Sequence, residues 1–440
     1  PQAALYSWIE RSSGAWRKEV RSGDVLLVVD VGGGTTDLSL IAVVEQDGNL
    51  QLQRIAVGEH ILLGGDNMDL ALAYGTARKL AEQGKQLDPW QTRALAHACR
   101  SAKETLLVDA SIDTVPVVVP SRGAKLIGGA IRTEVTRAEL EQVLLEGFFP
   151  PAAVSDQPVS RARGALTQLG LPYAQDAGVT RHLAAFLTRQ VGATAELAQQ
   201  SGFVNHAPTA NAGANAASFL HPTAVLFNGG VLKSAQISER LLGTINGWLA
   251  AEGAAPARLL SGADLDLAVA RGAAYYGYVR RGQGVRIRGG TAQSYYVAIE
   301  SAMPAIPGME PPIQALCLAP FGMEEGTDAG VAGQEFGLVV GEPVRLRFFG
   351  SSVRRHDQVG TLLDFWSADE LHELQEIEAT LPAQGRAVGE VVRVQLHARI
   401  TTTGTLELEA LPLSAQGQPG SERWKVELDT RNTDATTAQA

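Results

Sequence analysis

The sequence of residues 26–37 is LLVVDVGGGTTD. Its apolar first half predicts a buried strand, which leads directly into an aspartate, three glycines and two threonines. Because glycine has no side chain, the backbone N–H groups of Gly32–Gly34 can approach a phosphate closely, and Thr35 and Thr36 add hydroxyl donors. Asp30 is a candidate magnesium site, since Mg²⁺ binds through one or two carboxylates and keeps several waters. A plain glycine turn between two strands is the alternative to a phosphate loop.

Strands and helices alternate on both sides of this loop. Apolar runs at 25–44 and 50–57, joined by the turn Asp47-Gly48-Asn49, predict strands of one sheet. Helical spacing follows at 66–83 and 90–107, with a strand at 114–119. The first half of the chain is therefore expected to be α/β.

The pattern continues to about residue 280. Thr136 and Glu139 form a capping box ahead of a helix whose buried face holds Leu140, Val143, Leu144 and Phe148. Residues 150–163 and 201–220 have the composition of surface loops. We also expect a strand at 224–227 and helices at 177–191, 234–251 and 264–279. The small residues of the last helix predict that it approaches the sheet closely.

From about residue 286 short strands dominate. We expect them at 295–300, 343–349, 391–400 and 405–411, separated by Gly and Pro turns, as in a β-sandwich or barrel. A charged helix is expected at 367–378, because Ser367 and Glu370 have capping-box spacing. The polar tail at 430–440 is expected to be disordered.

Bulk composition excludes several classes of function. The chain has 440 residues, 45% of them hydrophobic, and a formal charge of -10, which argues against a nucleic-acid or anionic-membrane binder. No apolar run is long enough to span a membrane. The two cysteines, Cys99 and Cys317, lie far apart and support neither a disulfide framework nor a zinc site. A cytoplasmic setting is expected.

Three further motifs follow this loop along the chain. They are LGGDNMD at 63–69, LFNGGVLK at 226–233 and DLAVARGAA at 266–274. Taken singly, each has an ordinary alternative, such as a helix start or a strand-to-helix turn. Together with residues 26–37 they resemble the phosphate and adenosine motifs of the actin, sugar-kinase and heat-shock ATPase superfamily, and in particular its DnaK-like, seventy-kilodalton heat-shock branch, as a divergent bacterial-type member.

The resemblance implies a fold and a division into domains. It implies the second lobe of an actin-like ATPase, ribonuclease-H-like, over residues 1–285, with an inserted α+β subdomain at about 66–222. A mainly β domain, similar to the family's substrate-binding β-sandwich, is expected at 286–429; an unrelated β domain is the alternative. The family's first phosphate loop, catalytic lysine and a glutamate would precede Pro1, so the N-terminal part is expected to be missing.

The resemblance also implies a site for ATP or ADP with Mg²⁺. Asp30 and Thr35 would act in catalysis and Asp30 would hold the metal. Nucleotide binding is implied for Gly32, Gly33, Gly34, Thr35, Thr36, Gly64, Gly65, Asp66, Lys103, Gly229, Gly230, Lys233 and Asp266. In the helix that contacts adenine only Lys103 matches the family, because Arg100, Glu104 and Leu107 replace its acidic, basic and serine residues.

The function implied is that of an ATP-binding chaperone that holds unfolded client polypeptides, with co-chaperones as candidate partners. Hydrolysis is expected only in the N-terminally complete protein, since half of the catalytic apparatus is absent here. A small-molecule kinase of the same superfamily and a non-hydrolysing actin-like scaffold are the alternatives. None of the eight histidines is expected to form a metal pair.

Overall fold

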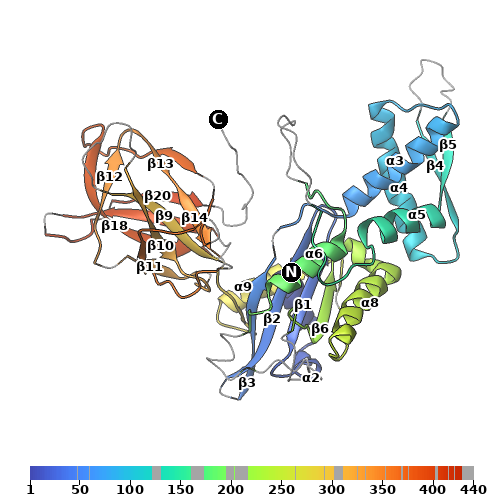
Figure 1. Cartoon of the computed structure of the whole chain (residues 1–440), viewed down its shortest axis with the longest axis horizontal. Coiled ribbons are helices and arrows are strands. Elements are labelled where there is room, and N and C mark those ends of the chain that lie inside the picture. The colour runs from blue at the N-terminus through green and yellow to red at the C-terminus, as the bar shows by residue number, and fades with distance from the viewer. Residues whose placement is uncertain are drawn as a thin grey trace. The chain divides into compact units, whose positions relative to one another are not determined.

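The computed structural model divides into two compact units, residues 1–287 and 288–440, and each is described by itself (Figure 1). The described residues are 1–46, 48–58, 60–120, 130–159, 173–194, 203, 217–262, 264–291, 293–301, 311–324, 326–331, 333–351, 353–367, 370–374, 376–401, 405–414, 416–420 and 422–428. Residues 160–163 of the loop expected at 150–163, residues 201–202 and 204–216 of the loop expected at 201–220, and the tail at 430–440 lie outside them.

Unit 1 is built on a six-stranded mixed sheet. Its strand order is β7-β6-β1-β2-β3-β8. Strands β1, β2 and β3 form an antiparallel meander, whereas β6 pairs parallel to β1 and β7 parallel to β6. The bounds are β1 Val25–Val31, β2 Thr36–Gln46, β3 Asn49–Val57, β6 Ala224–Asn228, β7 Arg258–Leu259 and β8 Ile287–Arg288. The expected strands of the α/β half are confirmed.

Both faces of this sheet are covered, which explains the unbroken apolar run of β1. Val25, Leu27, Val29 and Val31 enter one hydrophobic cluster, which also takes residues of α6 (Val179–Arg189) and α8 (Ala235–Ala251). Leu26 and Val28 point the other way, into a cluster with α1 (Gln2–Arg11). Alternate side chains of one strand therefore serve two layers of helices, as Figure 1 shows for α6 and α9 (Ala268–Arg280) on opposite sides of the sheet.

A group of helices and a hairpin follows β3. It contains α3 (Gly65–Glu82), α4 (Pro89–Val108), the antiparallel pair β4 (Thr114–Val119) and β5 (Ile131–Thr136), α5 (Arg137–Val143) and the π-helix η1 (Leu144–Phe148). These elements are gathered together at the right of Figure 1. The predicted capping box is confirmed: the Thr136 hydroxyl accepts from the Glu139 amide, and the Glu139 carboxylate accepts from the Thr136 amide at 2.8 Å.

Unit 2 is rich in strands. One sheet has the order β15-β10-β9-β14-β16; a second has the order β11-β18-β19-β20, with β12 also paired to β18; and β13 pairs with β17. Side chains of both larger sheets, such as Val297 and Leu396, share one hydrophobic cluster. The bounds are β9 Ser294–Glu300, β10 Ile313–Ala319, β11 Asp328–Gly330, β12 Phe336–Val340, β13 Pro343–Leu346, β14 Phe348–Ser351, β15 Leu362–Leu363, β16 His372–Glu373, β17 Ile377–Thr380, β18 Glu390–Ile400, β19 Leu406–Pro412 and β20 Trp424–Leu428.

The helix predicted at 367–378 is wrong. The Glu370 carboxylate accepts from the Ser367 amide at 3.0 Å, as in one half of a capping box, and the amide of Leu371 donates to the Ser367 carbonyl, but the turn stops there. The described residues beyond it pair as strands instead: β16 with β14 and β17 with β13. Strand pairing across the unit overrides the local helix signal.

Three other expectations need correction. The strand expected at 343–349 is split into β13 and β14, which belong to different sheets. The last helix of unit 1 begins at Ala268 rather than at Asp264. Its small residues do give a close approach, but to helix α1 and not to the sheet, since a Cβ on Gly272 would lie 1.9 Å from the Ala3 carbonyl oxygen. Helix α1 was missed by the sequence pattern altogether.

Candidate functional site

The glycine loop lies between β1 and β2, at the end of the buried strand. The amide of Gly32 donates to the Thr35 carbonyl at 2.8 Å and closes the loop. Gly33 and Gly34 are exposed, and a Cβ on Gly34 would meet no atom within 4 Å. Within the described part of the chain, the amides of Gly33, Gly34 and Thr35 have no acceptor. The loop therefore presents three free N–H donors beside an open space, which is the arrangement that binds an anion.

Residues 61–66 hydrogen-bond to the glycine loop and to Thr36, the residue that follows it. Thr36 exchanges two backbone hydrogen bonds with Ile61, at 2.9 and 3.2 Å, and its hydroxyl donates to the Leu63 carbonyl at 2.8 Å. The amides of Gly65 and Asp66 donate to the carbonyls of Gly32 and Gly33. The carbonyl groups of the loop are thus occupied by helix α3, while its N–H groups remain available.

Glycine is required where α3 begins. A Cβ on Gly64 would stand 2.6 Å from the Gly33 carbonyl oxygen and 2.7 Å from that of Gly32. The amide of Gly64 donates to the Asn67 side chain at 2.9 Å. The positive end of an 18-residue helix is therefore fixed against the loop, where it favours negative charge.

The turn after β6 reaches the same place from far along the chain. Gly229 has φ +92°, and a Cβ there would lie 2.2 Å from the Val31 carbonyl oxygen and 2.9 Å from an Asp30 carboxylate oxygen. In the following helix η2 (Gly230–Lys233), Val231 packs near Gly65, since a Cβ on that glycine would lie 3.3 Å from Val231 Cγ2. The structure thus brings together the predicted segments at 30–36, 64–66 and 229–230.

The first two of these segments lie within residues 14–152, which match the model of a protein family described as Hsp70 protein. Over these residues, the Hsp70 segment, the chain is similar to the Hsp70 family. The match implies an actin-like ATPase fold for this part, and the mixed sheet with helices on both faces agrees with it. Members of the Hsp70 family are ATP-binding chaperones that generally depend on Mg²⁺.

Lys103, also within the Hsp70 segment, is committed to a buried ion pair. Its Nζ lies 2.6 Å from Asp69 Oδ1 and donates to the Gly65 carbonyl at 3.2 Å. The two side chains are 9% and 8% exposed. Burial raises the pKa of Asp69, and the hydrogen bond and charge of Lys103 oppose that rise. The pair ties α4 to the first turn of α3, behind the glycine loop.

Two carboxylates, those of Asp30 and Asp37, flank the glycine loop in the Hsp70 segment. The Asp30 side chain is 16% exposed, and Asp30 is directly opposite Asp37 in the antiparallel register of β1 and β2. No group of three or more His, Cys, Asp and Glu in the described ranges could hold a metal ion by itself. A magnesium ion at Asp30 would therefore need ligands from a bound phosphate, as is usual for Mg²⁺.

Lys233 and Asp266, both predicted to bind nucleotide, form an ion pair with each other at the surface. Their side chains are 45% and 71% exposed. On α4, Arg100 lies 3.6 Å from Asp66 and its Nε donates to Glu104 at 3.3 Å. Arg100 thus pairs with Glu104 on its own helix and with Asp66 at the start of α3.

Sequence reasoning missed three contributors to this site. Asp69 ends the motif at 63–69 but was not named as a site residue, although it pairs with Lys103. Asp37 belongs to the motif at 26–37 but was not named as a site residue, and His60 was not named at all; their side chains meet at 2.6 Å. Proximity in sequence to the glycine motifs was the available signal for all three.

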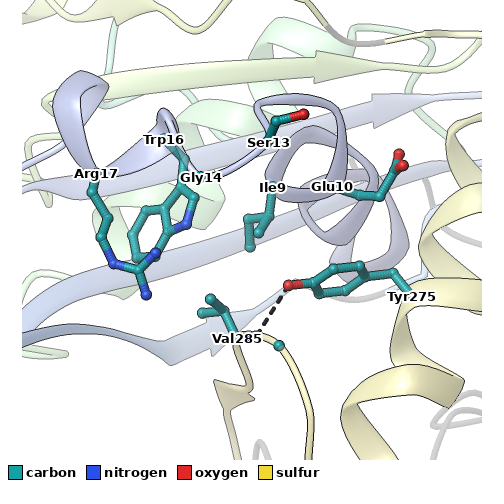
Figure 2. Close-up of a pocket in the computed structure, with 9 residues that line it drawn as sticks. Ile9, Glu10, Ser13, Gly14, Trp16, Arg17, Tyr275 and Val285 are labelled. Carbon is teal, nitrogen blue, oxygen red and sulfur yellow. Dashed lines mark hydrogen bonds between the residues drawn. The ribbon is translucent and has the colours of Figure 1, made fainter.

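A separate cavity of about 360 Å³ lies elsewhere in unit 1. It is lined by the end of α1, the turn into α2 (Trp16–Glu19), Tyr275 of α9 and residues 284–285, and it contains none of the predicted site residues. Figure 2 shows the Tyr275 hydroxyl pointing at Val285, whose amide donates to it at 3.0 Å.

Among the helices that the structure describes, none is long and apolar enough to cross a membrane.

Proposed function

We propose that this chain binds ATP or ADP with Mg²⁺ at the glycine loop, and that the complete protein is a chaperone. The observation that carries the proposal is the set of three acceptor-free amides, at Gly33, Gly34 and Thr35, beside the N-terminus of α3. Free backbone donors and a helix N-terminus together form a phosphate site that needs no basic side chain.

The residues present fit such a nucleotide. Gly32–Gly34 and Thr35 would surround the phosphates, and Gly64, Gly65 and Asp66 would bring the helix N-terminus against them. Thr36, predicted from the sequence to donate to a phosphate, would instead support the loop from within, since its amide and hydroxyl are bonded to the carbonyls of Ile61 and Leu63. Asp30 would hold the water shell of the metal, which neutralises phosphate charge when bound. Gly229, Gly230, Lys233 and Asp266 would lie toward the nucleoside, because the absence of a side chain at Gly229 lets the turn after β6 pack against Val31 and Asp30 beside the loop.

Calorimetric titration of Mg-ADP tests this proposal. The protein would be used as the 440-residue chain and as a longer chain that begins with the lobe expected before Pro1. Gly33→Val is the loop variant and Gly75→Val the control, because no atom lies within 4 Å of a Cβ at Gly75. Saturable binding that Gly33→Val abolishes and Gly75→Val leaves intact supports the site. Absence of binding in both chains overturns it.

We further propose that unit 2 binds unfolded client polypeptide and that nucleotide alters this binding. Unit 2 carries exposed apolar side chains, with Phe365 91% and Val391 63% exposed, and strand edges that can pair with an extended peptide. Co-chaperones would act on the complete protein, which alone is expected to hydrolyse ATP. The test is fluorescence anisotropy of a short labelled peptide with central leucines, with and without Mg-ATP. Unchanged, weak binding under both conditions contradicts the chaperone function.

A further inference from the structure

His60 makes a short contact with the carboxylate that follows the glycine loop. Its Nδ1 lies 2.6 Å from Asp37 Oδ1, and the other oxygen of the same carboxylate, Oδ2, accepts a hydrogen bond from the Thr35 hydroxyl at 2.9 Å. A carboxylate is an acceptor, so Nδ1 must carry a proton. The chain of contacts runs from the imidazole through Asp37 to a hydroxyl of the phosphate loop.

The backbone delivers the imidazole to this place. The next residue, Ile61, exchanges two hydrogen bonds with Thr36, the residue before Asp37. His60 and Asp37 are therefore held by two neighbouring extended segments whose register is set by main-chain bonds. The side chains are 51% and 26% exposed, so the contact stands at the edge of the open site rather than in the core.

The contact between His60 and Asp37 offsets electrostatic repulsion beside the glycine loop. Asp30 and Asp37 are directly opposite each other on β1 and β2, so their carboxylates share one face of the sheet. Like charges in that arrangement repel, and bound phosphates would add to the repulsion. A donor from His60 to Asp37 offsets part of this cost and leaves Asp30 as the carboxylate directed to a metal.

We infer that His60 is a positioning residue of the phosphate site: it holds Asp37, and Asp37 in turn holds the Thr35 hydroxyl. This inference rests on the proposed nucleotide-binding function. Removing the imidazole donor frees Asp37 to turn, releases the Thr35 hydroxyl, and leaves the Asp37 carboxylate without the donor that offsets its repulsion from Asp30 and the phosphates.

The test measures Mg-ADP affinity in His60→Leu, His60→Asn, Asp37→Asn and the double variant His60→Leu/Asp37→Asn. His60→Leu is expected to weaken binding roughly tenfold. His60→Asn is expected to remain within about twofold of the parent chain, because the Asn amide nitrogen occupies the place of Nδ1 and can donate to Asp37. In the Asp37→Asn background, His60→Leu is expected to have no further effect. The matched control is His97→Leu, at an exposed histidine of α4.

The outcomes distinguish a failure of the proposed nucleotide site from a failure of the role of His60. Parent chains that do not bind Mg-ADP overturn both the proposed function and this inference. If the parent binds and His60→Leu binds equally well, the nucleotide site stands and the role of His60 is wrong. A loss that persists in the Asp37→Asn background, or that His60→Asn fails to restore, shows that His60 does not act through Asp37.

Discussion

Gly229 lies so close to Val31 that a Cβ on the glycine would stand 2.2 Å from the Val31 carbonyl oxygen. Gly229 also has φ +92°, a conformation that costs other residues energy. We expect Gly229→Ala to destabilise unit 1 by about 2 kcal/mol or more, because strained φ and a forced backbone shift add together. Thermal unfolding followed by circular dichroism measures this. Gly230→Ala is the control, since its Cβ would meet no atom within 4 Å, and equal losses in both variants would contradict the packing argument.

Lys103→Met should destabilise the protein strongly at neutral pH. It leaves Asp69 as an uncompensated charge with a side chain 8% exposed, which costs about 3 kcal/mol. Urea unfolding of the variant and the parent chain gives this difference.

The Lys103→Met deficit should also depend on pH. Burial already raises the pKa of Asp69, and loss of Lys103 raises it further, so the folded variant binds a proton more tightly than the unfolded chain. Stability of the variant relative to the parent therefore improves as pH falls toward that raised pKa, and worsens as pH rises through it. A difference that is constant with pH would show that Asp69 does not carry the effect.

Asp176 should have the opposite pH dependence. Burial alone would raise its pKa, but hydrogen bonds from Arg181 and from the amides of Val159 and Gly178 outweigh burial and hold the pKa well below its usual range. The stabilisation is complete above the unfolded pKa of about 4 and is lost as pH falls toward the depressed folded value. Asp176→Asn should cost about 3 kcal/mol at neutral pH and little in strong acid.

Unfolding at several pH values checks Asp176→Asn against Asp113→Asn, whose carboxylate is 88% exposed. Similar stability losses in the two variants, or an equal loss at all pH values in Asp176→Asn, would contradict the assignment.

Two tyrosine hydroxyls should protect the end of unit 1 from hydrogen exchange. Tyr275 accepts from the Val285 amide (Figure 2) and Tyr6 from the Ile287 amide, each at 3.0 Å. Each bond contributes about 1 kcal/mol, so Tyr275→Phe and Tyr6→Phe should speed exchange of the corresponding amide by roughly fivefold. Hydrogen exchange resolved by mass spectrometry measures the segment. Tyr278→Phe, at a side chain 48% exposed, should leave it unchanged.

The sequence by itself determined the local elements and the loop. Sequence neighbours alone determine the strand and helix periodicity, the Thr136–Glu139 capping box and the glycine loop at 32–34. These features could therefore be predicted from local physical chemistry. Local signals also mislead where tertiary pairing is stronger. At Ser367–Glu370 one capping contact forms, but the described strands beyond it pair with β13 and β14.

Only the tertiary structure decided how the site is assembled. The burial of Lys103 against Asp69, the contact of His60 with Asp37 and the approach of Gly229 to Val31 each join segments that no local pattern connects. These contacts depend on which helix packs on which strand and in what register, and that is set by the shared burial of apolar faces across the whole unit. The residues of a phosphate site are therefore visible in the sequence, whereas the partners that orient them are not.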